Sequence, residues 1–131
     1  MTAAIDVVGM HGGEVFGATA RRALLGADVV VASGRHRDLV ELAEHQLHVE
    51  LAGPLSIVLD TVAAAVAAGD RVVILSLGDP GFFGIVRLAA ERFGPDGLSV
   101  HPAPSSVALA FGRIGRSWDD AVVLSAHGRP V

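Results

Sequence analysis

The continuous apolar run Val72-Val73-Ile74-Leu75 constrains the fold of this chain more than any other feature of its sequence. A half-exposed strand alternates apolar and polar side chains, so an unbroken run indicates a strand that is buried on both faces. Such strands occur mainly in parallel sheets that carry helices above and below. Residues 71–77 are therefore predicted to form a central strand of a parallel α/β sheet.

The rest of the chain alternates short apolar runs with helical patterns, which is typical of βα units. Further strands are expected at residues 5–9, 28–32, 48–51, 98–101 and 120–125. Helices are expected at residues 19–25, 35–45, 54–68, 83–93 and 105–114. The prediction is one α/β domain over residues 1–131, with a mostly parallel sheet of about five strands and helices on both faces.

The composition excludes several classes of protein. Hydrophobic residues make up 51% of the chain and charged residues 18%, which is too apolar for a disordered protein. Cysteine and lysine are absent, so disulfides, thiolate chemistry and Schiff bases are excluded. The net charge is −4 and the arginines are scattered, so no nucleic-acid partner is expected. The longest weakly polar run, residues 55–68, is shorter than the ~20 residues of a membrane span, and no signal peptide is visible, so a cytoplasmic protein is expected.

Three loops of unusual composition follow predicted strands, at the edge where parallel α/β sheets bind ligands. The first, residues 9–17, is rich in glycine. It matches no dinucleotide fingerprint, because His11 and Glu14 occupy two of the glycine positions, and it has no P-loop lysine. This loop is either a flexible connection or a place where a ligand approaches the backbone.

The second and third loops carry polar groups that have two interpretations each. In residues 78–84, Asp79 directly follows the central strand; its carboxylate can accept hydrogen bonds from ribose hydroxyls or an amine, or it can cap the next helix. In residues 102–106, Ser105 and Ser106 open a helix. They can help to bind a carboxylate at its N-terminus, or they can act only as caps.

Other chemistries find no support in the sequence. His45 and His48 are three residues apart, but no HExxH or facial-triad pattern accompanies them, so no metal site is predicted. No G-x-S-x-G segment is present, which argues against a serine hydrolase.

Together the three loops resemble one family, the tetrapyrrole (precorrin) methylases, which methylate corrin precursors with S-adenosylmethionine. The matching stretches are Val7-Val8-Gly9, residues 27–31, residues 75–84 and residues 102–111. Residues 78–84 carry the GDPxFxG pattern that marks the family. Residues 118–121 and 125–130 look most like the precorrin-6Y/precorrin-7 C5-methylating branch.

The resemblance implies the N-terminal of two α/β domains, with the methyl donor S-adenosylmethionine in the cleft between them and the second domain expected after Pro130. It implies C-methylation at C5 of a precorrin-6Y or precorrin-7 type intermediate in cobalamin biosynthesis, a precorrin substrate and a homodimer. The implied donor-binding residues are His11, Gly12, Gly78, Asp79, Pro80, Phe83, Ser105 and Ser106. Arg113 and Arg129 are candidates for contacts to substrate carboxylates, and no catalytic residue is identified.

Two other functions stay open. One is a nucleotide-binding oxidoreductase domain, against which the broken glycine fingerprint argues. The other is a non-catalytic domain that dimerises or binds a tetrapyrrole without turnover. Because half of a two-domain cleft encloses a ligand incompletely, this chain alone is expected to be inactive and to bind the donor weakly. One of the rings of Phe82 and Phe83 is expected to face the cleft and the other to pack on the sheet.

Overall fold

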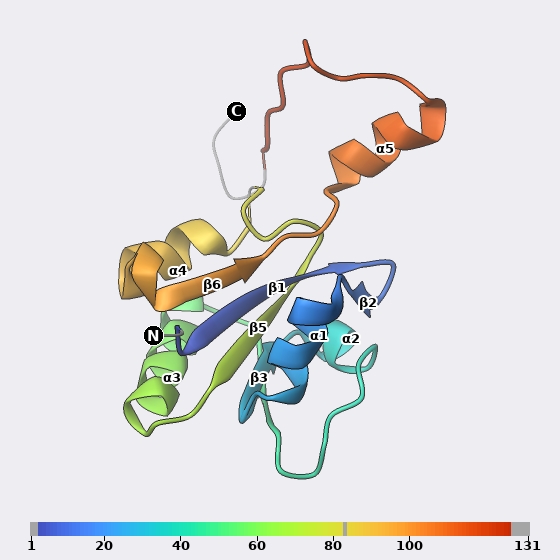
Figure 1. Cartoon of the computed structure of the whole chain (residues 1–131). Helices are drawn as coiled ribbons and strands as arrows, with labels where there is room; N and C mark the ends of the chain where they lie inside the picture. Colours follow the sequence, from blue (N-terminus) through green and yellow to red (C-terminus); the bar gives the residue numbers. More distant parts are fainter. Residues whose placement is uncertain (1–2, 83, 127–131) are drawn as a thin grey trace.

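The computed structural model describes residues 3–82 and 84–126, which form a sheet with helices on both faces (Figure 1). The strands are β1 (Ile5–His11), β2 (Glu14–Val15), β3 (Val29–Ala32), β4 (Leu47–Glu50), β5 (Val72–Leu77) and β6 (Leu98–His101). The helices are α1 (Ala18–Leu25), α2 (Gly34–Arg37), α3 (Leu55–Ala67), α4 (Val86–Phe93) and α5 (Ser106–Ile114), with a 3-10 turn at Pro95–Gly97. No helix in the described part of the chain is long and apolar enough to span a membrane.

The sheet has β5 at its centre, as the apolar run predicted. β5 pairs in parallel with β1 on one side and with β3 on the other, and β4 and β6 extend the parallel sheet outward. The short β2 is antiparallel to the end of β1 and is the sixth strand. The predicted parallel α/β fold is thus confirmed.

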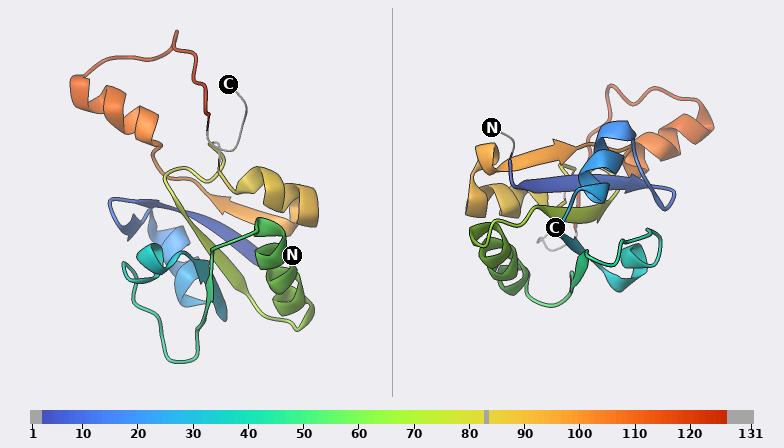
Figure 2. Two further views of the ribbon diagram at one scale, coloured as in Figure 1. Left: turned by 180° about the vertical axis from the view of Figure 1, so that it is seen from behind. Right: turned by 60° about the horizontal axis from the view of Figure 1, so that its bottom comes forward.

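The core consists of two layers, one on each face of the sheet. Alternate residues of β5 explain both, because Val73 and Leu75 pack toward α1 whereas Val72 and Ile74 pack toward α3. Figure 2 shows α1 and α3 on opposite faces of the sheet. Since both side-chain sets of β5 are buried, the strand has no polar position among its first four residues.

The first glycine-rich loop, for which the sequence left both a flexible connection and a ligand approach open, contains a hairpin. β1 continues to His11, and the chain then turns back at Gly12 and Gly13 into β2. These glycines have φ angles of 59° and 82°, which suit a two-residue hairpin turn. Two adjacent glycines between extended residues are the sequence signal for this hairpin.

The predicted helix at residues 35–45 is wrong beyond Arg37, where α2 ends. The following chain is held by Gln46, whose buried side-chain amide donates to the carbonyls of Leu24 and Ala27 at 2.7 and 2.9 Å. Its Oε1 accepts from the backbone N–H of Ala43 at 2.9 Å. The conformation of the chain after α2 is therefore set by contacts with the end of α1, which is distant in sequence.

The predicted strand at residues 120–125 is also wrong, because residues 121–126 have no regular structure. Val122 and Leu124 are 84% and 85% exposed, and no described strand pairs with them. The segment follows α5, which extends away from the sheet and has no buried residue (Figure 1). In the chain just before this segment, Trp118 stacks on Phe111 of α5, with ring centroids 5.9 Å apart. An apolar run forms a strand only where a partner takes up its backbone hydrogen bonds.

Candidate ligand-binding site

The loops that follow β5 and β6 meet at Gly9, which lies within β1. A Cβ atom at this position would lie 2.5 Å from the carbonyl oxygen of Gly78, 2.7 Å from Cβ of Ala103 and 3.0 Å from Cδ of Pro80. No side chain fits at these distances, so Gly9 is required by the close packing of these two loops on β1 rather than by its own dihedral angles. The close approach brings all three strand-end segments to one place.

The loop after β5 has a compact path. Gly78 has a φ of 70°, which favours glycine, and its N–H donates to the carbonyl of Met10 at 2.9 Å. A Cβ at Gly84 would lie 2.5 Å from the carbonyl oxygen of Pro80. The glycines of the GDPxFxG pattern are thus explained by the close turns of the loop itself.

Asp79 joins two of the loops. Its Oδ1 accepts a hydrogen bond from the backbone N–H of Ala103 at 3.3 Å. The capping interpretation is wrong, because Ile85 holds the cap position of α4 and makes no side-chain cap bond. Oδ2 of Asp79 has no hydrogen-bond or ion-pair partner among the described residues and remains able to accept from a ligand.

Ser105 and Ser106 open α5, as predicted. The hydroxyl of Ser105 accepts from the N–H of Ala108 at 3.1 Å, so the capping interpretation is confirmed for this residue. Ser106 is the first residue of the helix and is exposed. The N-terminus of α5 lies beside the loop that carries Asp79.

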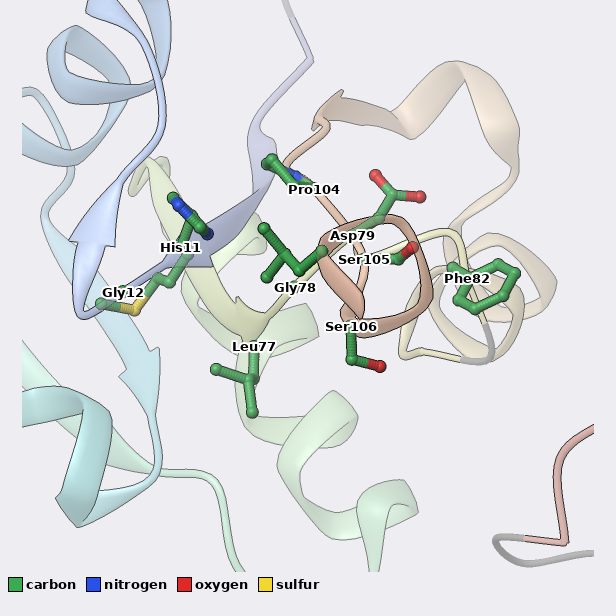
Figure 3. Close-up of a pocket in the computed structure, with 11 residues that line it drawn as sticks. His11, Gly12, Leu77, Gly78, Asp79, Phe82, Pro104, Ser105 and Ser106 are labelled. Atoms are coloured by element: carbon green, nitrogen blue, oxygen red, sulfur yellow. The ribbon is translucent and has the colours of Figure 1, made fainter. Parts of the chain in front are cut away.

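A pocket of about 300 Å³ lies between these segments and is partly open to solvent. It is formed from the ends of β1 and β5, the loop after β5 and the start of α5 (Figure 3). Its lining residues are Met10, His11, Gly12, Leu77, Gly78, Asp79, Phe82, Pro104, Ser105, Ser106 and Leu109. Mostly apolar walls with a few convergent polar groups are typical of small-molecule sites, although this volume is at their lower limit.

His11 has an unpaired polar atom in this site. Its Nδ1 is buried and has no hydrogen-bond partner among the residues that the structure describes. The ring packs edge-on against Phe16, with centroids 6.4 Å apart, which holds it at the pocket. A buried polar atom without a partner calls for an explanation, and a bound ligand would supply one.

The structure brings most of the predicted site residues together. His11, Gly12, Gly78, Asp79, Ser105 and Ser106 all line the pocket. Pro80 does not, because it is fully buried behind the loop against Gly9. Phe82 lines the pocket, in keeping with the expectation that one ring faces the cleft, whereas Phe83 lies outside the described residues.

The two predicted substrate contacts have different outcomes. Arg113 is exposed in the last turn of α5 and is not part of the pocket lining, and Arg129 lies outside the described residues.

Sequence reasoning missed Leu77, which is 70% exposed at the end of β5. The signal available in the sequence was that Leu77 is the last apolar residue before the loop. Among the described residues, no three His, Cys, Asp or Glu side chains are grouped to hold a metal ion.

Comparison with known proteins identifies related sequences. The family model of the tetrapyrrole (corrin/porphyrin) methylases matches residues 8–131. A curated relative, the precorrin-6Y C(5,15)-methyltransferase [decarboxylating] of Sinorhizobium sp, is 38% identical over 125 residues, which are 95% of this chain and 30% of the relative. The chain therefore spans less than a third of that relative.

Solved structures share the fold. A precorrin-6Y methylase of cobalamin biosynthesis from Archaeoglobus fulgidus has a TM-score of 0.69 at 22% identity, over 95% of this chain and 65% of that one. A cobalt precorrin-4 methyltransferase has a TM-score of 0.69 at 20% identity, over 86% and 51%. The uroporphyrin-III-C-methyltransferase of Thermus thermophilus has a TM-score of 0.64 at 22% identity, over 92% and 63%. The chain thus spans between half and two thirds of these structures.

Proposed function

The chain belongs to the tetrapyrrole (corrin/porphyrin) methylase family, and from this premise we propose that its strand-end pocket binds S-adenosylmethionine for the C-methylation of a precorrin. The specific reaction proposed is methylation at C5 of a precorrin-6Y or precorrin-7 type intermediate in cobalamin biosynthesis. It is supported by the name of the Sinorhizobium relative, a precorrin-6Y C(5,15)-methyltransferase.

The observation that carries the proposal is the convergence of the loops after β5 and β6 on Gly9 of β1, beside a pocket lined by different polar groups. The free Oδ2 of Asp79 suits hydroxyl or amine donors of a nucleoside. The N-terminus of α5, with the hydroxyl of Ser106, suits the carboxylate of an amino-acid moiety. Phe82 offers an aromatic surface beside them. These are the chemical parts of a sulfonium nucleoside that carries an amino acid.

The methyl transfer requires little from the protein beyond positioning the donor and the substrate. S-adenosylmethionine supplies a methyl group activated by its sulfonium. A carbon of the macrocycle forms a bond to that methyl as the carbon–sulfur bond breaks, and the macrocycle then loses a proton to restore its conjugation. The residues of this chain would orient the donor and exclude water, and orientation alone contributes up to about 7–11 kcal/mol in favourable cases. No nucleophilic side chain is needed.

The partly open pocket also supports a shared cleft. Good small-molecule sites bury about 70–90% of their ligand, which a pocket of about 300 Å³ with one open side does not achieve for a donor of this size. We infer that a second domain supplies the remaining wall in a homodimeric, cytoplasmic enzyme. Arg113 lies seven residues after Ser106, which is about 10 Å along the same face of α5, and would contact a substrate carboxylate at the rim.

Calorimetric titration of this chain tests the donor site. We expect weak binding of S-adenosylmethionine and no binding of NAD. Asp79→Ala should abolish the donor signal, and Asp79→Asn, which keeps an acceptor for Ala103, should reduce it less. Asp96→Ala is the matched control, because this exposed carboxylate lies outside the pocket.

The outcomes separate the three functions. Binding of NAD in place of the donor would support the oxidoreductase alternative. Binding of a porphyrin without the donor, also in a two-domain form, would support a non-catalytic domain. Unchanged donor affinity in Asp79→Ala would show that the pocket is not the donor site.

A further inference from the structure

Residues 33–37, here called the α2 turn, lie at the same edge of the sheet as the pocket. They directly follow β3, which pairs with β5, and the last residue of β5, Leu77, lines the pocket and is 70% exposed. Paired strands lie about 4.8 Å apart, so the α2 turn begins one strand away from that leucine. On the other side, Leu39 packs at Gly13, next to the pocket residue Gly12. Figures 1 and 2 show α2 beside β2.

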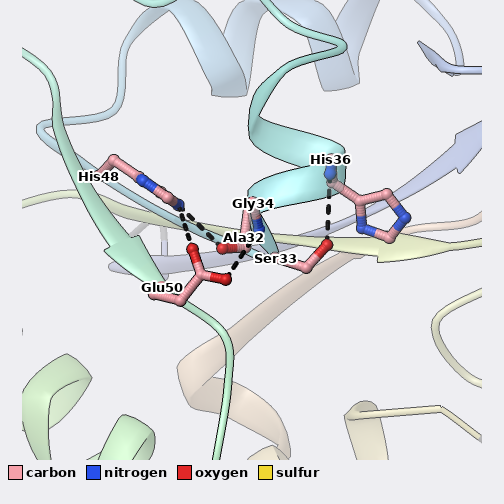
Figure 4. A network of polar contacts seen from close by, with 6 residues as sticks. All are labelled: Ala32, Ser33, Gly34, His36, His48 and Glu50. Carbon is pink, nitrogen blue, oxygen red and sulfur yellow. Dashed lines mark hydrogen bonds and ion pairs between the residues drawn. The ribbon is translucent and has the colours of Figure 1, made fainter.

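A network of polar contacts holds the backbone of the α2 turn (Figure 4). The N–H of Gly34 donates to Oε1 of Glu50 at 2.9 Å. His48 lies 3.6 Å from the other oxygen of that carboxylate and donates to the carbonyl at the end of β3 at 2.9 Å. The hydroxyl of Ser33 accepts from the N–H of His36 at 3.2 Å. The turn is thus anchored to β4 before any ligand arrives.

The α2 turn carries positive charge that no acidic residue in the described part of the chain neutralises through an ion pair. Three of the four residues of α2 are basic, namely Arg35, His36 and Arg37. Neither arginine forms an ion pair with any residue that the structure describes, including the adjacent Asp38. Arg37 makes one long hydrogen bond, at 3.5 Å, to the carbonyl of Val40. In a chain of net charge −4, this is a local excess of unpaired guanidinium groups.

We propose that the α2 turn is a subsite for the carboxylates of the tetrapyrrole substrate, an inference that rests on the proposed function. Uroporphyrin-type tetrapyrroles carry acetate and propionate groups around the macrocycle. A ring lying over the exposed Leu77 would bring such groups to Arg35 and Arg37, whose guanidinium groups match carboxylate geometry. Anchoring the turn in advance reduces the entropy that binding costs.

The test is a fluorescence titration of the full chain with uroporphyrin, an octacarboxylic porphyrin, at low and high salt. The double variant Arg35→Gln, Arg37→Gln should bind about tenfold more weakly and lose much of the salt dependence, because each ion pair near the surface contributes modestly. The corresponding double lysine variant should recover part of the affinity. The affinity for a dicarboxylic porphyrin should change less in the same variants. Arg22→Gln, in the last turn of α1 at the opposite edge, removes a comparable charge and should change binding less than twofold.

The same variants are titrated with S-adenosylmethionine, so that the subsite and the donor site are judged separately. Loss of porphyrin affinity with unchanged donor affinity would support the subsite. If the double glutamine variant binds uroporphyrin as tightly as the parent, the subsite is wrong and the proposed function stands. If the parent binds the donor but no porphyrin, the subsite is also wrong. If it binds neither, the proposed function fails with it.

Discussion

Replacing Gly9 by alanine tests the contact on which the candidate site depends. The added methyl group would lie 2.5 Å from the carbonyl oxygen of Gly78 and 2.7 Å from Cβ of Ala103. Both are below the 3.0 Å under which something must shift. Neither neighbour is the end of a flexible side chain, so the loops after β5 and β6 must move apart.

The expected cost follows from overpacking a rigid site. Such substitutions typically destabilise a protein by about 1–3 kcal/mol. Because the nearest atoms, a carbonyl oxygen and a Cβ, cannot rotate away, we expect Gly9→Ala to cost an amount near the upper end of this range. For a domain of this size, about 3 kcal/mol lowers the Tm by roughly 10 °C. Thermal and urea denaturation followed by circular dichroism measure both quantities. Because the pocket walls separate, donor binding should be lost even well below the Tm.

Gly112→Ala is the control for this experiment. Gly112 lies in α5, and a Cβ there would meet nothing within 4 Å. Alanine is favoured over glycine in a helix by about 0.5–1 kcal/mol, so this variant should be unchanged or slightly more stable. If Gly9→Ala melts at the same temperature as the parent and Gly112→Ala, the loops after β5 and β6 do not pack on Gly9 and the site geometry is refuted.

Three further substitutions test other parts of the structure. His101→Ala leaves the carboxylate of Asp6, 9% exposed, without its 2.8 Å partner, and should cost roughly 2 kcal/mol in urea denaturation; an unchanged midpoint would contradict the pairing. Gln46→Ala removes three hydrogen bonds and should cost about 2–3 kcal/mol by the same assay, whereas a loss below about 0.5 kcal/mol would argue against them. Phe111→Leu removes the ring stacked on Trp118, the single tryptophan, and should change its fluorescence emission; an identical spectrum would exclude the stacking.

The regular elements were predictable where short-range periodicity reports burial directly. The apolar run of β5 predicted the centre of the sheet, because a strand covered on both faces has no polar position. The helix expected at residues 54–68 is α3, and its buried residues Val58, Leu59 and Val62 follow helical spacing. Because the strands of a parallel sheet run in the same direction, the loops at their carboxyl ends all lie at one edge. The edge that holds the pocket therefore also followed from the sequence.

Errors arose where a distant partner decides the local structure. The chain after α2 leaves the helix because Gln46 bonds to the carbonyls of Leu24 and Ala27, and residues 121–126 form no strand because no described strand pairs with them. Neither reason is visible in a local window of sequence. The hairpin at Gly12 and Gly13 did have a local signal, which the nucleotide-motif comparison of the same loop did not use.

By itself, the sequence determined the fold class and the central strand, because each depends on residue type and spacing along the chain. The candidate site residues were proposed from the family resemblance, and most of them line one pocket. The tertiary structure alone decided how those residues act. It made Gly9 the point where the loops after β5 and β6 pack on β1, gave Asp79 a partner in Ala103 and left Pro80 buried behind the pocket. These roles depend on distances between strands that are far apart in sequence, and local periodicity contains no information about such distances.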